Sequence, residues 1–263
     1  MSISNLIKGK KPKPLESFQL NKISKIFLLP IYHLIHKNII FGYIHKRFIK
    51  NFKYKKFSFS LRDIKLPTSS YACFLFKTYE INDRVLVEKH ITKKNKSIII
   101  GGGIGFIGTI AYFLSKNKVL VFEINKEIIN TLKENLIQNK VLFECIEMNL
   151  VLKHIEKKYY YPGDNFLGTS AYVKQGEKLP MNNILFSEIK NIEEYNTLII
   201  DAEGAEEHYI SNINILKNIR YLIFEFHFNI LDNKKKNALF KVLEDNNFYL
   251  EDKFLNSYYF KKK

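Results

Sequence analysis

The sequence has no tryptophan and only two cysteines, Cys73 and Cys145, among its 263 residues. Two cysteines cannot build a disulfide framework, and their wide separation matches no metal-ligand spacing. We therefore expect two reduced, buried thiols in a cytoplasmic protein. The first twenty residues also lack the apolar core and the small-residue cleavage site of a signal peptide.

Acidic residues are scarce at the N-terminus. Residues 1–60 hold thirteen Lys or Arg and one acid, Glu16, so 29 basic and 25 acidic residues remain for the rest of the chain. Most of the formal net charge of +16 therefore belongs to an N-terminal arm, and the remainder is close to neutral. This asymmetry predicts a basic, partly amphipathic extension over residues 1–60 and a globular domain over residues 61–263.

The arm has no apolar run long enough to cross a bilayer, and Pro30 interrupts any early helix. Residues 26–57 nevertheless mix large apolar side chains with lysine and histidine. Two interpretations stay open. The segment 1–57 lies on an anionic membrane surface as an amphipathic element, or it packs on the body with its lysines in water. The first interpretation implies a cytoplasmic protein that is peripheral at the membrane.

Glycine is concentrated in one place. The apolar run Ile98–Ile100 is followed by five glycines within eight residues, and a second apolar run, Val119–Phe122, ends at Glu123. The glycines are Gly101, Gly102, Gly103, Gly105 and Gly108. A strand, a glycine turn, a helix and a second strand ending in an acid predict a nucleotide-binding βαβ unit. Glu123 is placed to hold a ribose through its hydroxyl groups.

Two cofactor classes share this pattern. Gly103-x-Gly105-x-x-Gly108 fits the dinucleotide fingerprint, in which a helix N-terminus receives a pyrophosphate. Gly101-x-Gly103-x-Gly105 fits equally well the turn of enzymes that use S-adenosylmethionine (SAM). A glycine-rich turn without any ligand is the third interpretation. The glycines alone do not separate these three.

The rest of the chain alternates between strand and helix patterns. We expect short strands within residues 57–91 (FSFSLRDIKL and FLFKTYEI), followed by a short helix from Asp83. Beyond the glycines the pattern predicts helices over 105–115, 127–139, 206–216 and 235–244, and strands over 141–146, 198–201, 221–227, 248–250 and 257–260. This alternation predicts an α/β fold with a mostly parallel, Rossmann-like sheet of seven strands, helices on both faces and a C-terminal antiparallel hairpin.

Three blocks together resemble the FkbM family of SAM-dependent methyltransferases: IIIGGGIGFIGT with VFEIN, LIIDAEGAE at residues 198–206, and LIFEFH at residues 222–227. The pair Tyr79-Glu80 and the loop Gly168-Thr169-Ser170 are also similar to that family, and the resemblance covers roughly residues 75–230. One departure is Ile99, where many methyltransferases have an acid that helps to hold the methionine amino group. Another residue would have to substitute for it.

The candidate site residues follow the predicted strands, because ligands of parallel α/β sheets gather beyond the carboxyl ends of the strands. The expected cofactor-binding residues are Gly101, Gly103, Gly105, Glu123, Glu147 and Met148. Glu147 and Met148 end the third strand, where methyltransferases usually contact adenine. Cys145, beside them, serves core packing equally well.

Four further residues are the expected catalytic group: Asp201, Glu203, Glu225 and His227. The ordinary pKa of histidine suits His227 to accept a hydroxyl proton near neutral pH, and Asp201 would orient the substrate or the histidine. Glu203 and Glu225 add carboxylates, which hard cations favour, so the question of a metal stays open and no metal ligand is assigned. A solvated strand face and an ordinary helix start are the alternatives for these acids.

The resemblance implies a SAM-dependent methyltransferase that methylates a hydroxyl of a sugar, a polysaccharide precursor or another small molecule. One alternative is an RNA methyltransferase that uses the basic arm, although Asp201 is followed by Ala-Glu and no Pro-Cys pair is present. A second is an NAD-dependent oxidoreductase, for which no Tyr-x-x-x-Lys pair is evident near the glycine turn. A degenerate fold with a structural role is the third.

Overall fold

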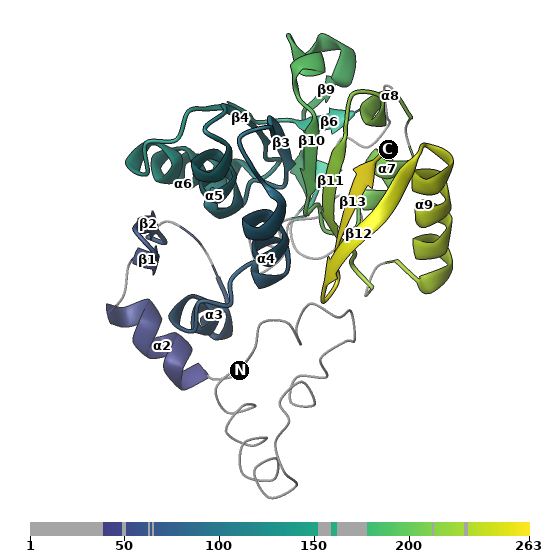
Figure 1. The fold of residues 1–263 in the computed structure, drawn as a ribbon. Helices are drawn as coiled ribbons and strands as arrows, with labels where there is room; N and C mark the ends of the chain where they lie inside the picture. Colours follow the sequence, from purple (N-terminus) through teal and green to yellow (C-terminus); the bar gives the residue numbers. More distant parts are fainter. Residues whose placement is uncertain are drawn as a thin grey trace, which may run out of the picture.

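The computed structural model describes residues 39–48, 51–62, 64, 66–151, 159–161, 178–211, 213–228 and 231–263 (Figure 1). Residues 1–38 of the predicted extension and the loop Gly168-Thr169-Ser170 lie outside the described residues.

A seven-stranded sheet forms the centre of the protein, in the order β12-β13-β11-β10-β3-β4-β5. Its strands are β3 (Ser97–Ile100), β4 (Val119–Phe122), β5 (Phe143–Ile146), β10 (Thr197–Ile200), β11 (Tyr221–Glu225), β12 (Phe248–Phe254) and β13 (Ser257–Lys262). The first five are parallel, and β13 runs antiparallel to both β11 and β12. The predicted fold class is therefore confirmed, including the antiparallel C-terminal hairpin.

Both faces of the sheet are covered by helices, and this explains why its central strands are apolar runs rather than alternating ones. In β3, Ile99 packs into a core that includes α4 (Ile81–His90), α5 (Phe106–Ser115) and α6 (Lys126–Gln138). Its neighbours Ile98 and Ile100 point to the other face, toward α7 (Glu206–Ile210), α8 (Ile213–Leu216) and α9 (Asn233–Asp245). Figure 1 shows these two helical layers on either side of the sheet.

The N-terminal elements pack on the first of these layers. They are α2 (Ile39–Phe48), β1 (Asn51–Tyr54), β2 (Phe57–Ser60), η2 (Thr68–Ser70) and α3 (Tyr71–Leu75). Phe52 of β1 is 1% exposed, and its ring lies 5.3–5.8 Å from those of Phe59, Phe74 and Phe106. In the part of the extension that the structure describes, the β1–β2 hairpin thus belongs to the main core.

Two details of the predicted secondary structure are wrong. The segment FLFKTYEI is not a strand, because Tyr71, Ala72 and Phe74 bury one side of a single turn, α3, and residues 76–80 lead into α4. The predicted helix over 206–216 is divided into α7 and α8. Of the predicted strand segment FSFSLRDIKL, residues 57–60 form β2, and the helix around Asp83 is confirmed.

Short elements connect β5 to β10. They are β6 (Asn149–Val151) paired with β9 (Asn183–Leu185), β7 (Tyr159–Tyr160) paired with β8 (Leu179–Pro180), η4 (Phe186–Glu188) and η5 (Ile192–Glu194). Among the described residues, no helix has the length and apolar character needed to span a membrane.

Candidate functional site

The glycine turn lies where the strand order reverses, between β3 and β10, which is where ligands of open α/β sheets bind. At this point the loop after β3 touches the loop after β10. A Cβ atom on Gly101 would lie 1.9 Å from the carbonyl oxygen of Asp201, and Gly101 has a φ of +86°. A Cβ atom on Gly102 would lie 2.4 Å from Leu132 Cδ1. The packing of the protein on itself therefore requires glycine at position 101, and a side chain at position 102 would displace Leu132 and Val121, whether or not a ligand binds.

Gly103 and Glu123 join the turn to the end of β4. The Gly103 amide donates a hydrogen bond of 2.9 Å to Glu123 Oε2, and the Asn125 amide donates one of 2.8 Å to Glu123 Oε1. Glu123 is only 6% exposed, and burial raises the pKa of its carboxyl. Gly105 precedes α5 directly. The structure thus brings together four of the six expected cofactor-binding residues.

Glu147 and Met148 follow β5, the edge strand of the sheet. Glu147 is exposed and forms an ion pair with Lys133 of α6, whereas Met148 is half-buried. Among the described contacts, none joins either residue to the glycine turn. Cys145 is half-buried as well, and burial raises the pKa of its thiol to about 12.

Glu80, which sequence reasoning did not assign to the site, lies beside the turn. Its carboxylate oxygen Oε1 lies 3.2 Å from the position of a Cβ atom on Gly103, and the Tyr79 hydroxyl lies 3.0 Å from the same position. The Tyr79 hydroxyl donates a hydrogen bond to Glu80. Burial, and next the charge of Asp201, raise the pKa of Glu80 to about 8. Its backbone φ of 46° is a left-handed conformation, which is uncommon for glutamate.

The four expected catalytic residues converge at the carboxyl ends of β10 and β11. His227 Nε2 lies 3.5 Å from Asp201 Oδ1 and 3.4 Å from Glu203 Oε2. Asp201, Glu225 and His227 each offer one ligand atom, and these atoms lie within 4.8 Å of one another. Residues that are 26 positions apart in the sequence thus form one cluster.

Glu206 fixes the orientation of the histidine, and sequence reasoning did not assign it either. It has no exposed surface, and its Oε1 accepts hydrogen bonds from His227 Nδ1 at 2.7 Å and from the Gly204 amide at 3.1 Å. Its place in the block Asp-Ala-Glu-Gly-Ala-Glu was the available signal.

The surroundings of His227 change its expected chemistry. Burial alone would lower its pKa, but the hydrogen bond to Glu206 and the charges of Asp201, Glu206 and Glu203 raise it to about 10. The expectation that this pKa lies near neutral pH is therefore wrong. With both ring nitrogens facing carboxylates, the imidazole is held in place rather than available as a base.

Acidic groups crowd this end of the sheet. Burial is the main cause that raises the pKa of Glu203 and of Glu225 to about 7, and the charge of Asp201 adds to it. The helix α4 contributes Asn82, whose Nδ2 donates to Glu225 Oε1 at 2.7 Å, and the buried Asp83. Asp83 accepts a 2.5 Å hydrogen bond from the Ser257 hydroxyl, and burial raises its pKa well above the ordinary value.

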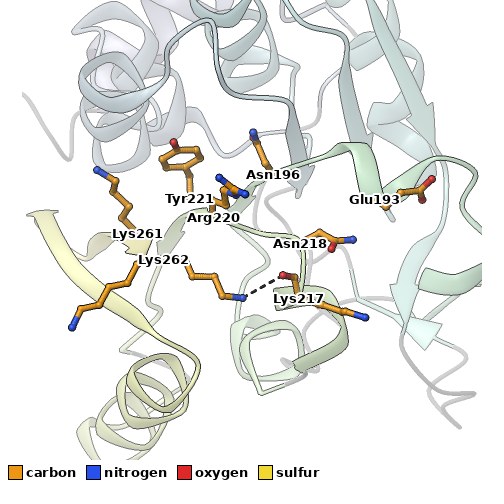
Figure 2. A pocket seen from close by; sticks show the side chains of 9 residues that line it. Glu193, Asn196, Lys217, Asn218, Arg220, Tyr221, Lys261 and Lys262 are labelled. Atoms are coloured by element: carbon orange, nitrogen blue, oxygen red, sulfur yellow. Dashed lines mark hydrogen bonds between the residues drawn. The ribbon is translucent and has the colours of Figure 1, made fainter.

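A basic hollow of about 760 Å³ lies at the opposite, amino ends of β10 and β11 (Figure 2). Figure 2 shows the side chains of Lys217, Arg220, Lys261 and Lys262 around it, with Lys262 Nζ donating a 3.3 Å hydrogen bond to the Lys217 carbonyl. An anion that binds here would lie at least about 13 Å from the acidic cluster, the length of four residues of β10.

Comparisons with known proteins add little to this geometry. None of the known family models matches the sequence, and none of the curated proteins does. The resemblance to the FkbM family therefore rests on the motifs alone.

Several solved structures are similar in fold. They include a ribosomal protein L11 methylase from Lactobacillus delbrueckii (14% identity, 69% of this chain and 76% of that chain, TM-score 0.42) and the M. jannaschii TYW2 in complex with AdoMet (12%, 81% and 87%, 0.43). A protein of the NADB-Rossmann superfamily from Streptococcus agalactiae is also similar (10%, 67% and 64%, 0.41). At these identities and TM-scores the likenesses carry no argument about cofactor or substrate.

Proposed function

We propose that this protein is a SAM-dependent methyltransferase. The observation that carries the proposal is the carboxylate of Glu80 beside Gly103 of the glycine turn. An acid at this turn favours a ligand with a positively charged group. Glu80 would also replace the acid that many methyltransferases have at the position of Ile99. It lies close to the turn in space, although it precedes the turn by more than twenty residues in the sequence.

Charge distinguishes the two cofactor classes that the glycines leave open. SAM carries an ammonium and a sulfonium group, whereas a dinucleotide brings an anionic pyrophosphate to the turn. Within the part of the chain that the structure describes, no Lys or Arg forms an ion pair with Glu80, Asp201 or Glu225. A cationic group bound here would favour the ionised form of these acids, which release their protons as it binds, whereas a pyrophosphate would meet only acids and, among the described residues, no Lys or Arg paired with them. The residues present therefore fit SAM better than NAD.

Each group of the site then has a role. Glu123 would accept hydrogen bonds from ribose hydroxyls, and Glu80 would accept one from the methionine ammonium. SAM, when bound, supplies a methyl group activated by the sulfonium. Asp201 and Glu203, whose side chains are 27% and 28% exposed, would orient an acceptor hydroxyl and take its proton. His227, only 12% exposed, would position these two carboxylates.

For the acceptor we propose a hydroxyl of a sugar, a polysaccharide precursor or another small molecule, on the motif resemblance to the FkbM family. The RNA alternative draws on basic groups, and the basic hollow is the described feature that suits it. That hollow lies at the far end of the strands from the acidic cluster. RNA phosphates bound in the basic hollow would therefore not by themselves place a nucleotide base next to Asp201.

Calorimetric titration of the full chain with SAM, S-adenosylhomocysteine and NAD, in a buffer with EDTA, tests the cofactor. We expect the first two to bind and NAD not to bind. Glu80→Gln should weaken SAM binding about tenfold or more, because it removes a charge-assisted hydrogen bond. Glu88→Gln, in the helix that follows Glu80, is the matched control, since Glu88 pairs with Lys55 and Tyr54 instead. Binding of NAD without any response to SAM would contradict the proposal.

We also propose that the N-terminal segment 1–57 contacts an anionic membrane surface through the part that precedes β1, because Phe52 and Phe57 pack in the core. The support in the described residues is α2, where Tyr43, Ile44 and Phe48 are 61%, 43% and 75% exposed beside the exposed Lys46 and Arg47. Exposed apolar and basic side chains on one helix suit an interface with anionic lipid.

Sedimentation with phosphatidylserine vesicles tests this proposal. Binding should keep a component that resists high salt, because apolar insertion is not screened whereas charge attraction is. Replacing both Tyr43 and Phe48 by serine should remove that component, and Ile137→Ser, an exposed position on α6, should not. Complete loss of binding in high salt would leave only attraction to phosphate.

A further inference from the structure

The geometry around His227 resembles that of a metal-bound histidine. Its Nδ1 donates to the buried Glu206, and this leaves Nε2 facing Asp201 Oδ1 at 3.5 Å and Glu203 Oε2 at 3.4 Å. Metal-ligating histidines usually donate their second ring nitrogen to a carboxylate in this way, which fixes the ring and its tautomer. The orientation of the ring is thus set by a residue that cannot itself reach solvent.

The spacing of the facing atoms suits a shared cation. For bonds of about 2.1 Å, two ligands of a tetrahedral ion lie about 3.4 Å apart, which is close to the 3.5 Å from His227 Nε2 to Asp201 Oδ1. Glu225 completes the set, since its carboxylate, Asp201 and His227 offer atoms within 4.8 Å.

The cluster also contains more carboxyl groups than basic groups, which favours the binding of a cation. Asp201 Oδ1 is buried without a hydrogen-bond partner, and so is Glu206 Oε2. Among the described residues, the acids whose charges act on this cluster include Glu203, Glu225 and Asp83, and His227 is the cationic group that acts on it. Buried carboxylates of this kind must take up protons, pair with a base or coordinate a metal.

We propose that Asp201, Glu225 and His227 bind one divalent first-row transition metal ion of the class of Mn²⁺ or Zn²⁺. Two carboxylates and an imidazole suit these ions, whereas Ca²⁺ and Mg²⁺ favour all-oxygen sites. Glu206 is the outer group that holds the histidine ligand, and Asn82 holds Glu225. The site stands on this geometry and does not rest on the proposed methyl transfer.

Titration of the EDTA-treated, dialysed full chain with MnCl₂, followed by the electron paramagnetic resonance of free Mn²⁺, tests the proposal. We expect one saturable site, competition by Zn²⁺ and little competition by Ca²⁺. Asp201→Asn and Glu225→Gln should each weaken binding at least about tenfold, and Glu206→Gln should do so about 10–100-fold as an outer-shell change. Glu144→Gln, which removes an exposed acid paired with Lys118, is the matched control.

Spin-echo spectroscopy of the wild-type protein with bound Mn²⁺ tests the histidine without any variant, because a coordinated imidazole nitrogen modulates the echo. No saturable binding at millimolar metal, no nitrogen modulation, or undiminished binding in folded Asp201→Asn and Glu225→Gln would each overturn the proposal. SAM binding measured in EDTA is a separate readout, so failure of the metal site and failure of the cofactor assignment are distinguishable.

Discussion

Glu206, which has no exposed surface, accepts a 2.7 Å hydrogen bond from Nδ1 of His227. This contact ties the start of α7 to the segment after β11 and sets the direction of the imidazole. The orientation of the imidazole in the acidic cluster therefore depends on a fully buried residue. Glu206 acts on the cluster through its hydrogen bond with His227.

We expect Glu206→Gln to lower the free energy of unfolding by about 1–3 kcal/mol, because the buried imidazole loses a charged acceptor. Urea denaturation of the metal-free protein measures this effect. Glu207→Gln is the control: its ion pair with Lys235 is about half exposed and should contribute less than about 1 kcal/mol. Equal losses in the two variants would show that the hydrogen bond with His227 contributes no more to the free energy of unfolding than an exposed ion pair does.

Glu80 predicts a pH dependence of stability. Its folded-state pKa is raised from 4.5 to about 8, so the folded protein keeps a proton that the unfolded chain has lost over this range. Stability should therefore fall as the pH rises from about 4.5 to 8. In Glu80→Gln this decline should be shallower, and the remaining slope should come from other acids such as Asp83. Urea unfolding at several pH values in EDTA checks the difference, and parallel curves would contradict it.

Gly101 and Gly108 should respond differently to alanine. Gly101→Ala places a Cβ atom 1.9 Å from the Asp201 carbonyl oxygen at a positive φ, so we expect a loss of about 3 kcal/mol or more, or failure to fold. Gly108 lies within α5, and a Cβ atom there would meet Ile99 Cδ1 at an ordinary 3.5 Å. Gly108→Ala should change stability little or raise it by up to about 1 kcal/mol. Thermal unfolding compares the two, and a tolerated Gly101→Ala would refute the packing argument.

Two phenylalanines of the N-terminal region test where the body begins. Phe52→Ala should cost about 3–5 kcal/mol, because Phe52 is buried among other aromatic rings. Phe48→Ala, at a position 75% exposed on α2, should stay within about 0.5 kcal/mol. Urea denaturation of both variants measures the costs. A small effect of Phe52→Ala would mean that the β1–β2 hairpin is dispensable for the fold.

The sequence was informative wherever one local pattern decided the structure. The strands at 98–100 and 119–122 were predicted because short apolar runs flanked by glycine or an acid suit a doubly covered sheet. The segment around Phe74 was predicted as a strand because a single helical turn buries too few residues to show its period. The break between α7 and α8 could not be predicted, because neither glycine nor proline lies between the two helices in the sequence.

The site was predicted in part for a related reason. Asp201 and His227 stand at strand ends, which the parallel topology brings together. Glu80 comes from a turn before α4, so its approach to Gly103 depends on how that helix packs on β11 and β13. Glu206 belongs to a recognisable sequence block, but its burial and its hydrogen bond with His227 arise only in the folded protein.

Asp201 and Glu225 lie at the carboxyl ends of β10 and β11, and the basic hollow lies at the amino ends of the same two strands. The protein is therefore electrically polarised along these strands. A small cation that diffuses nearby is drawn to the acidic end and turned away from the basic one before any contact forms, and an anion experiences the reverse. Because dissolved salt screens such fields beyond about 10 Å, the rate of encounter should depend on ionic strength much more strongly than the strength of the contacts themselves.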